Sequence, residues 1–116
     1  MVMNIQVESQ GSIQIVRVKG KITFEHCPDL RRRLDAVLAE SYVREVRIDF
    51  REVPYIDSSG VGEILRLFKR MMEIHGEVVL LNPNKKLQNL FLMYRFNRFI
   101  RIHQEEESDP DVKTDR

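Results

Sequence analysis

Apolar and polar residues alternate strictly at the start of the chain. Over residues 3–8 every second side chain is apolar, which predicts a strand with one face on the core and the other in water. A turn is expected around Gly11, followed by a second strand over residues 13–19. A short third strand is expected just beyond Gly20.

Three later segments have the spacing of amphipathic helices. The first opens at Pro28, since proline is well tolerated in a first turn, and its apolar residues continue to about residue 41. The second covers residues 59–75 and has a strongly helical pattern. The third follows Asn82 and Pro83, which are predicted to form its N-cap and N1 pair.

Short apolar strands are expected between and after these helices, over residues 46–51, 77–82 and 98–103. Gly76 stands where a helix C′ glycine is expected. The alternation of strand and helix implies βαβ crossovers, and the half-polar strands suggest that one face of the sheet is open. We therefore predict an α/β fold, a mixed four- to five-stranded sheet with helices packed mainly on one face.

The chain has 116 residues, which fits one domain of common size. We expect that domain to cover residues 1–103 and the charged segment 104–116 to be a disordered tail, because the tail has almost no apolar side chains. Basic residues number 19 and acidic residues 18, for a net charge of +1. Such balance argues against a dedicated nucleic-acid-binding protein, which would show a basic excess.

The location of the protein is predicted from its single cysteine and its lack of targeting segments. Cys27 has no partner for an internal disulfide, which suits a reducing compartment. The N-terminus lacks the basic and apolar regions of a signal peptide. No run approaches the roughly 18 apolar residues of a membrane span, so we expect a cytoplasmic protein without membrane insertion.

The segment Asp57-Ser58-Ser59-Gly60 separates a predicted strand from the second helix. Its simplest interpretation is a capping cluster, because Asp and Ser side chains accept hydrogen bonds from free helix amides. Gly60 and Gly62 do not fit that interpretation alone, since each glycine weakens a helix by about 1 kcal/mol relative to alanine. The two glycines suggest that something must come close to the backbone here.

A phosphorylated serine is the functional alternative for this loop. A phosphate would add roughly −1.5 to −2 charges, partly offset by the positive end of the helix and opposed by Asp57. These effects are small for the fold. They are larger for a partner packed over the loop, because burying an unpaired charge costs more than the roughly 1.4 kcal/mol that changes affinity tenfold.

The stretch VPYIDSSGVGEILRLFKRM (53–71) resembles the signature of the STAS domain, specifically of bacterial anti-sigma factor antagonists. The likeness covers about residues 3–103. It includes the following supporting segments: VRVKGKI, VRIDF, HGEVVLLNPNKKLQNLF and FIRIH.

The resemblance implies a regulatory binding protein with no catalytic activity. The unphosphorylated protein would bind an anti-sigma factor that is also a serine kinase, and this would release the sigma factor. The kinase would phosphorylate Ser58, and a PP2C-type phosphatase would reverse the modification. Asp57 would cap the helix and shape the loop. The other residues assigned to the phosphoacceptor loop and partner surface are Ser59, Gly60, Val61, Gly62, Thr23 and Glu25.

The sequence departs from the family in two places. Many antagonists carry an acidic residue after the glycine of the second strand, whereas this chain reads Gly20-Lys21-Ile22-Thr23. This implies either altered contacts with the kinase or a partner with different charges. The segment YRFNRF (94–99) replaces a small glycine-containing turn and enlarges a basic-aromatic surface without an assigned role.

No metal, cofactor or catalytic site is predicted. His26 and Cys27 are adjacent, but the other two histidines are scattered without ligand spacing. Nothing resembles a nucleophile elbow around Ser58, and no Gly-Lys-Ser/Thr follows Gly60 as in a P-loop. The run 31–33 of three arginines is expected to be a solvated helix face, with contact to an acidic partner as the alternative.

Two alternatives to the antagonist hypothesis stay open. The same domain could be an adaptor subunit of an ABC-type lipid transport complex, in which the second helix contacts an ATPase and no phospho-switch operates. A small hydrolase using Ser58 or Ser59 is a third class, which the missing base argues against.

Overall fold

The computed structural model describes residues 3–40 and 42–105. The predicted tail lies outside the described residues except for Gln104 and Glu105. Gln104 donates a side-chain hydrogen bond to the Pro83 carbonyl (2.7 Å), and the Glu105 amide donates to Asn82 Oδ1 (2.7 Å). None of the described helices is both long enough and apolar enough to cross a membrane.

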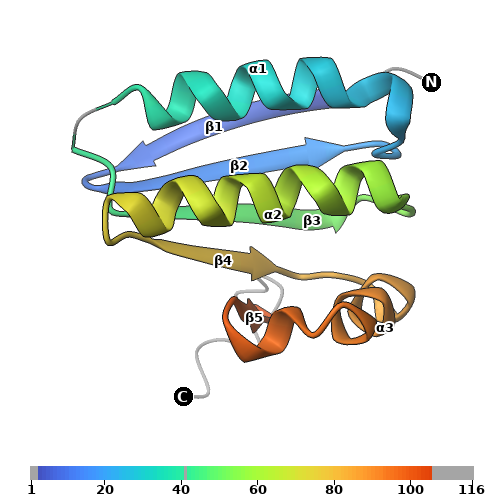
Figure 1. Cartoon of the computed structure of the whole chain (residues 1–116). Helices are drawn as coiled ribbons and strands as arrows, with labels where there is room; N and C mark the ends of the chain where they lie inside the picture. Colours follow the sequence, from blue (N-terminus) through green and yellow to red (C-terminus); the bar gives the residue numbers. More distant parts are fainter. Residues whose placement is uncertain (1–2, 41, 106–116) are drawn as a thin grey trace, which may run out of the picture.

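A five-stranded mixed sheet forms the centre of the molecule, in the order β1-β2-β3-β4-β5 (Figure 1). Strand β1 pairs antiparallel with β2, and every later pair is parallel. The strands are β1 (Asn4–Gln10), β2 (Ile13–Lys19), β3 (Glu45–Glu52), β4 (Glu77–Leu81) and β5 (Arg101–His103). The predicted α/β class and the mixed sheet are confirmed.

Two long helices, α1 (Cys27–Leu38) and α2 (Ser58–Glu73), lie side by side on the same face of the sheet (Figure 1). The third helix, α3 (Lys85–Met93), lies beyond the end of β4. The prediction that the helices pack mainly on one face of the sheet is therefore confirmed. Each helix joins two parallel strands in a βαβ crossover, and such crossovers share one handedness.

The core lies between the sheet and the two long helices. Val16, Ile48 and Leu80 occupy one row across β2, β3 and β4, and each is at most 2% exposed. They belong to the same hydrophobic cluster as Leu34 of α1 and Leu67 of α2. The period-2 strands and 3.6-period helices of the sequence bury their apolar sides against one another, which is the main stabilisation of such a layer.

The prediction of a short third strand beyond Gly20 is wrong. Only one isolated bridge forms there, between Ile22 and Ile56. The Ile22 amide donates to the Tyr55 carbonyl (3.0 Å), and the Ile22 carbonyl accepts from the Asp57 amide (3.1 Å). The chain then turns into the short 3-10 helix η1 (Phe24–His26), so it leaves the sheet before a strand can extend.

Two predicted helix boundaries also differ. The N-cap of α3 is Asn84, whose Oδ1 accepts from the Leu87 amide (2.8 Å), and not Asn82. At the end of α2 the left-handed C′ residue is His75 (φ 59°), and Gly76 follows it. Gly76 is needed for close packing, because a Cβ there would lie 2.9 Å from the Arg44 carbonyl oxygen.

Candidate functional site

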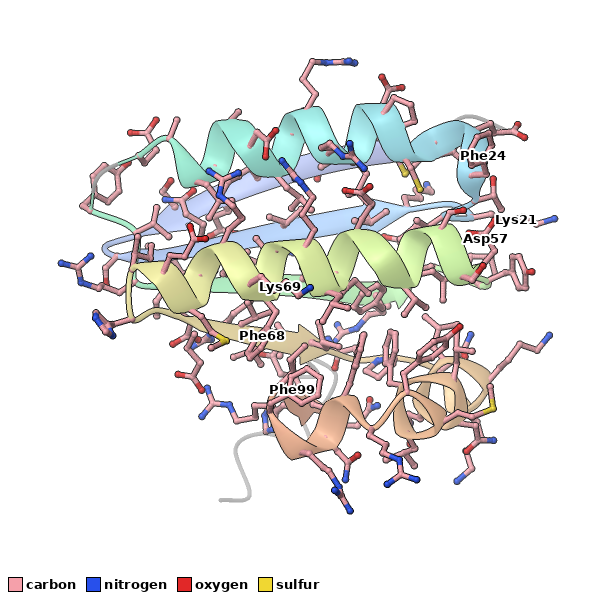
Figure 2. The ribbon with its side chains drawn as sticks, in the orientation of Figure 1. Lys21, Phe24, Asp57, Phe68, Lys69 and Phe99 are labelled. Carbon is pink, nitrogen blue, oxygen red and sulfur yellow. The ribbon has the colours of Figure 1, made fainter. Side chains whose placement is uncertain are left out.

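The segments that follow β2 and β3 meet at one edge of the sheet. Because the two strands are parallel, their carboxyl ends lie together, and the Gly20 amide donates to the Glu52 carbonyl (3.0 Å). Figure 2 shows Lys21, Phe24 and Asp57 gathered at this end of the molecule. The edge therefore brings η1 next to the start of α2.

Asp57 joins the two segments through both oxygens of its carboxylate. Oδ1 accepts from the Gly60 amide (3.1 Å) and so caps α2. Oδ2 accepts from the Phe24 amide (2.9 Å), which lies 33 residues away in the sequence. The capping role expected of Asp57 is present, and the bond to Phe24 adds a second one.

Ser58 is the first residue of α2, and its side chain is exposed. The first amides of a helix have no partner within the helix, so this end favours negative charge. Ser59 is half-buried, and Val61 is 3% exposed and packs in the core. Among the serines of the loop, Ser58 is thus the one most open to another molecule.

The two glycines of the loop face different surroundings. A Cβ on Gly60 would lie 2.6 Å from Ile56 Cγ1 and 2.8 Å from Ile22 Cγ2, so Gly60 allows the two segments to pack closely. Gly62 is exposed, and nothing within 4 Å would meet a Cβ there. Packing inside the domain explains Gly60 but gives no reason for Gly62.

Sequence reasoning missed Phe24, which is the most prominent apolar side chain beside Ser58. It is 76% exposed and stands on η1, between Thr23 and Glu25. Thr23 and His26 hold this turn, with the Thr23 hydroxyl 3.0 Å from His26 Nδ1. An aromatic residue between Thr23 and Glu25, next to the start of the predicted first helix, was the available signal.

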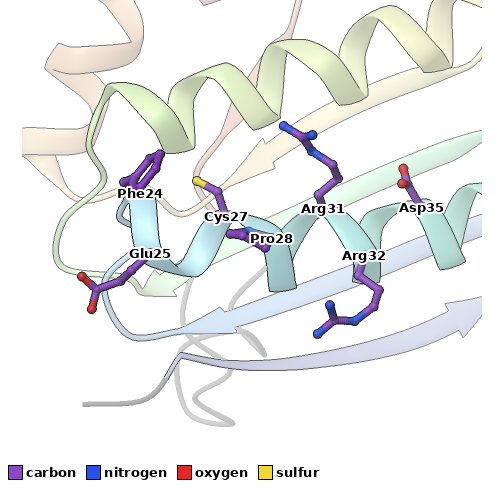
Figure 3. A pocket seen from close by; sticks show the side chains of 7 residues that line it. All are labelled: Phe24, Glu25, Cys27, Pro28, Arg31, Arg32 and Asp35. Carbon is purple, nitrogen blue, oxygen red and sulfur yellow. The ribbon is translucent and has the colours of Figure 1, made fainter.

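A groove of about 530 Å³ runs from Phe24 along α1 (Figure 3). Its lining residues are Phe24, Glu25, Cys27, Pro28, Arg31, Arg32 and Asp35. Figure 3 shows Cys27, Arg31 and Asp35 projecting toward α2, with Glu25 and Arg32 directed away from it. The groove thus continues the exposed surface that begins at Ser58.

Arg31 is bound within the domain and is not simply part of a solvated face. Its guanidinium donates to Glu63 of α2, with Nη2 2.5 Å from Oε2, and the Glu63 side chain is only 5% exposed. These hydrogen bonds raise the pKa of Arg31. Arg31 is 54% exposed, as expected of a solvated helix face, but it also binds Glu63, and a contact between residues 32 positions apart leaves no local pattern. Arg32 does face solvent, where it pairs with Asp29.

Cys27 lies at the first position of α1, below the groove, and is buried. Burial raises the pKa of its thiol, and the carboxylates of Glu63 and Asp57 add to this effect. The thiol therefore stays protonated at neutral pH and is a poor nucleophile. Within residues 3–40 and 42–105, no three His, Cys, Asp or Glu side chains are grouped closely enough to hold a metal ion.

Comparisons with known proteins agree on one protein family. Residues 4–108 match the model of the STAS domain family. The chain is similar to the anti-sigma-B factor antagonist of Bacillus subtilis (strain 168), with 35% identity over 92 residues, covering 77% of this chain and 82% of the relative.

Two solved structures show the same fold. An anti-sigma factor antagonist from Mycobacterium paratuberculosis superposes with a TM-score of 0.75 at 19% identity, covering 97% of this chain and 93% of that one. The Bacillus cell fate determinant SpoIIAA, in its phosphorylated form, superposes with a TM-score of 0.71 at 18% identity, covering 97% and 100%.

Proposed function

The chain belongs to the STAS domain family, and from that premise we propose that it is an anti-sigma factor antagonist controlled by phosphorylation of Ser58. Unmodified, it binds an anti-sigma factor that is also a serine kinase. The kinase transfers the γ-phosphoryl group of ATP to Ser58 Oγ, the hydroxyl proton is lost and ADP leaves. A PP2C-type phosphatase restores the serine. The protein acts by binding and has no catalytic residue of its own.

One observation carries this proposal: Ser58 is exposed at the start of α2, within a surface that another protein can cover. Phe24 supplies a large apolar contact on one side of it, and Gly62 leaves the next turn of α2 flat. Phenylalanine is among the aromatic residues enriched in the buried centres of protein–protein interfaces. The curated relative is itself an anti-sigma-B factor antagonist, which supports the assignment.

Phosphorylation at this position acts on the interface far more than on the fold. The helix start offsets part of the new charge, typically by 0.3–1 kcal/mol, and Asp57 is already engaged with two amides. A partner packed over Ser58 must instead bury an unpaired dianion, which costs more than the roughly 1.4 kcal/mol of a tenfold change in affinity. One of the structural neighbours was solved in a phosphorylated form, which is consistent with such a cycle.

The test uses a purified anti-sigma factor with serine-kinase activity from the same organism. Incubation with ATP should place one phosphate on Ser58, identified by mass spectrometry. Ser58→Ala should bind the partner like the wild type, and Ser58→Asp should bind at least about tenfold more weakly in calorimetry. Ser12→Asp is the matched control, because Ser12 is an exposed serine in the β1–β2 turn at the opposite edge of the sheet.

Two results would contradict the proposal. One is a phosphate mapped to another residue, and the other is a Ser58→Asp variant that binds as tightly as the wild type. A stable complex with a transporter ATPase that is indifferent to Ser58→Asp would instead identify the adaptor alternative.

A further inference from the structure

A second exposed surface lies on the side of α2 that faces away from α1, next to the 3-10 helix η2 (Phe96–Arg98) (Figure 2). Phe68 of α2 and Phe99 pack with their ring centroids 4.8 Å apart. Phe99 is 43% exposed, and Met72, one turn after Phe68, is 56% exposed. The basic-aromatic surface, as we name it, consists of Phe68, Lys69, Met72, Arg95, Arg98 and Phe99.

A continuous series of aromatic contacts fixes this surface to the core. The ring of buried Phe91 lies 5.4 Å from Phe50 and 5.8 Å from Phe96, and Phe96 lies 5.7 Å from Phe99. The apolar part of the surface is therefore held in place before any partner arrives. A pre-organised surface loses little side-chain entropy on binding, which favours a docking role.

The cations of the surface lack ion pairs, in contrast to most arginines of the domain. Within the described part of the chain, the arginines with an acidic partner include Arg17, Arg31, Arg32, Arg47, Arg66, Arg70 and Arg101. No ion pair within that part involves Lys69, Arg95 or Arg98. Unpaired cations beside exposed rings are complementary to an apolar side chain flanked by carboxylates.

The backbone at Arg95 adds an independent observation. Arg95 has φ 63° and ψ 30°, the left-handed conformation that a helix C-terminus usually assigns to glycine or asparagine. Glycine would relieve this strain. A strained residue that keeps a long cationic side chain points to a function for that side chain.

The distance between this surface and Ser58 bears on which partner can dock there. Phe68 is ten residues after Ser58 in α2, which corresponds to about 15 Å along the helix. That distance exceeds the roughly 8 Å Debye length at physiological ionic strength. A protein that docks here therefore meets the same surface whether or not Ser58 is phosphorylated.

Two other occupants fit the surface less well. A second copy of the chain would bring its own Lys69, Arg95 and Arg98 against the same three cations, which is repulsive. An anionic membrane is recognised by clusters of roughly four to eight basic residues, more than this surface provides.

We propose that the basic-aromatic surface docks the phosphatase that dephosphorylates Ser58, through an apolar side chain flanked by carboxylates. The proposal rests on the function proposed above, since it requires phosphorylated Ser58 as the substrate. Docking holds the enzyme while a water oxygen bonds to phosphorus and the bond from phosphorus to Ser58 Oγ breaks. Oγ takes a proton, and inorganic phosphate leaves.

The experiment measures dephosphorylation of the full chain, phosphorylated at Ser58, by a purified PP2C-type phosphatase from the same organism. Lys69→Glu and Arg98→Glu should lower kcat/KM at least about tenfold through KM, with kcat unchanged. Arg95→Gly is the sharper variant, because it should raise Tm while it raises KM. Lys85→Glu, a matched charge reversal on exposed α3, should stay within about twofold of the wild type. All four variants should bind the anti-sigma factor like the wild type.

Several outcomes would overturn the docking site. The first is a kcat/KM within about twofold of the wild type for Arg98→Glu and Lys69→Glu, and the second is an equal loss for Lys85→Glu. The third is sedimentation of the wild type, but not of Arg98→Glu, with phosphatidylglycerol vesicles, which would assign the surface to a membrane. If the kinase never modifies Ser58, the proposed function fails as well, a result distinct from normal dephosphorylation of the variants.

Discussion

Asp57 connects two segments of the chain that are 33 residues apart in sequence. One oxygen caps α2 at Gly60, and the other holds the Phe24 amide on η1. A single carboxylate thus sets both the start of the helix that carries Ser58 and the position of the neighbouring exposed ring. The cap was predictable from the sequence, since Asp before Ser-Ser-Gly is a strong N-cap signal. The bond to Phe24 was not, because it depends on two strands lying in parallel.

Gly60 and Gly62 allow the docking function to be separated from the stability of the fold. Gly62→Ala should increase the free energy of unfolding by about 1 kcal/mol, because alanine favours a helix and its Cβ meets no atom within 4 Å. The same change should weaken anti-sigma factor binding, since a methyl group would project into the partner. Urea denaturation and calorimetry measure the two effects.

Gly60→Ala serves as the matched control for this prediction. Its Cβ would press on Ile56 and Ile22, so we expect a loss of about 1–3 kcal/mol of stability. A Gly62→Ala variant that is more stable and binds the partner undiminished would show that the open space at Gly62 is not used by the partner.

Helices α1 and α2 are joined by ion pairs between their side chains. Arg31 binds Glu63, and Asp35 pairs with Arg66 (3.0 Å) and Arg70 (3.4 Å). Because the Glu63 side chain is 5% exposed, its charge depends on Arg31 for compensation. The pair therefore holds the two helices together, and its Arg31 side chain also lines the groove that starts at Phe24.

Removing the Arg31 side chain should destabilise the domain by leaving the carboxylate of Glu63 buried and unpaired. We expect Arg31→Ala to lower Tm by roughly 5–10 °C in thermal denaturation. Arg32→Ala is the control, because Arg32 pairs with Asp29 on the exposed side of α1 and should change Tm by less than about 2 °C. Equal shifts for the two variants would mean that water compensates Glu63 as well as Arg31 does.

Most helices and strands could be predicted because their apolar periodicity is long and regular. The failures occurred where a local signal competed with a tertiary contact. Apolar residues beyond Gly20 indicated a strand, but the Thr23–His26 turn diverts the chain after one bridge. Gly76 indicated a C′ position, but His75 occupies that position. Glycine is needed at 76 because a Cβ there would clash with the Arg44 carbonyl oxygen.

The whole molecule presents two surfaces at different places along α2. The surface around Ser58 was indicated by a contiguous motif, so its central residues could be named from sequence. Phe24 and the groove along α1 could not, because they join this surface only through the parallel arrangement of β2 and β3. The sequence indicated only the segment 94–99 of the basic-aromatic surface. The rigidity of this surface depends on the contact between Phe68 and Phe99, which are far apart in sequence.

Because Ser58 is exposed and lies outside the core, its phosphorylation should leave the domain folded while it abolishes partner binding. The phosphate gains from the free amides at the start of α2 and is repelled by Asp57, and these effects are each of the order of 1 kcal/mol and opposite in sign. We therefore expect the Tm of the phosphorylated chain to lie within about 5 °C of the unmodified chain. Thermal denaturation followed by circular dichroism measures this Tm. Gly60→Ala is the comparison, and its Tm should fall further than that of the phosphorylated chain. A phosphorylated chain that unfolds as readily as Gly60→Ala would mean that release of the partner reflects loss of the fold, and not a charge placed in the interface.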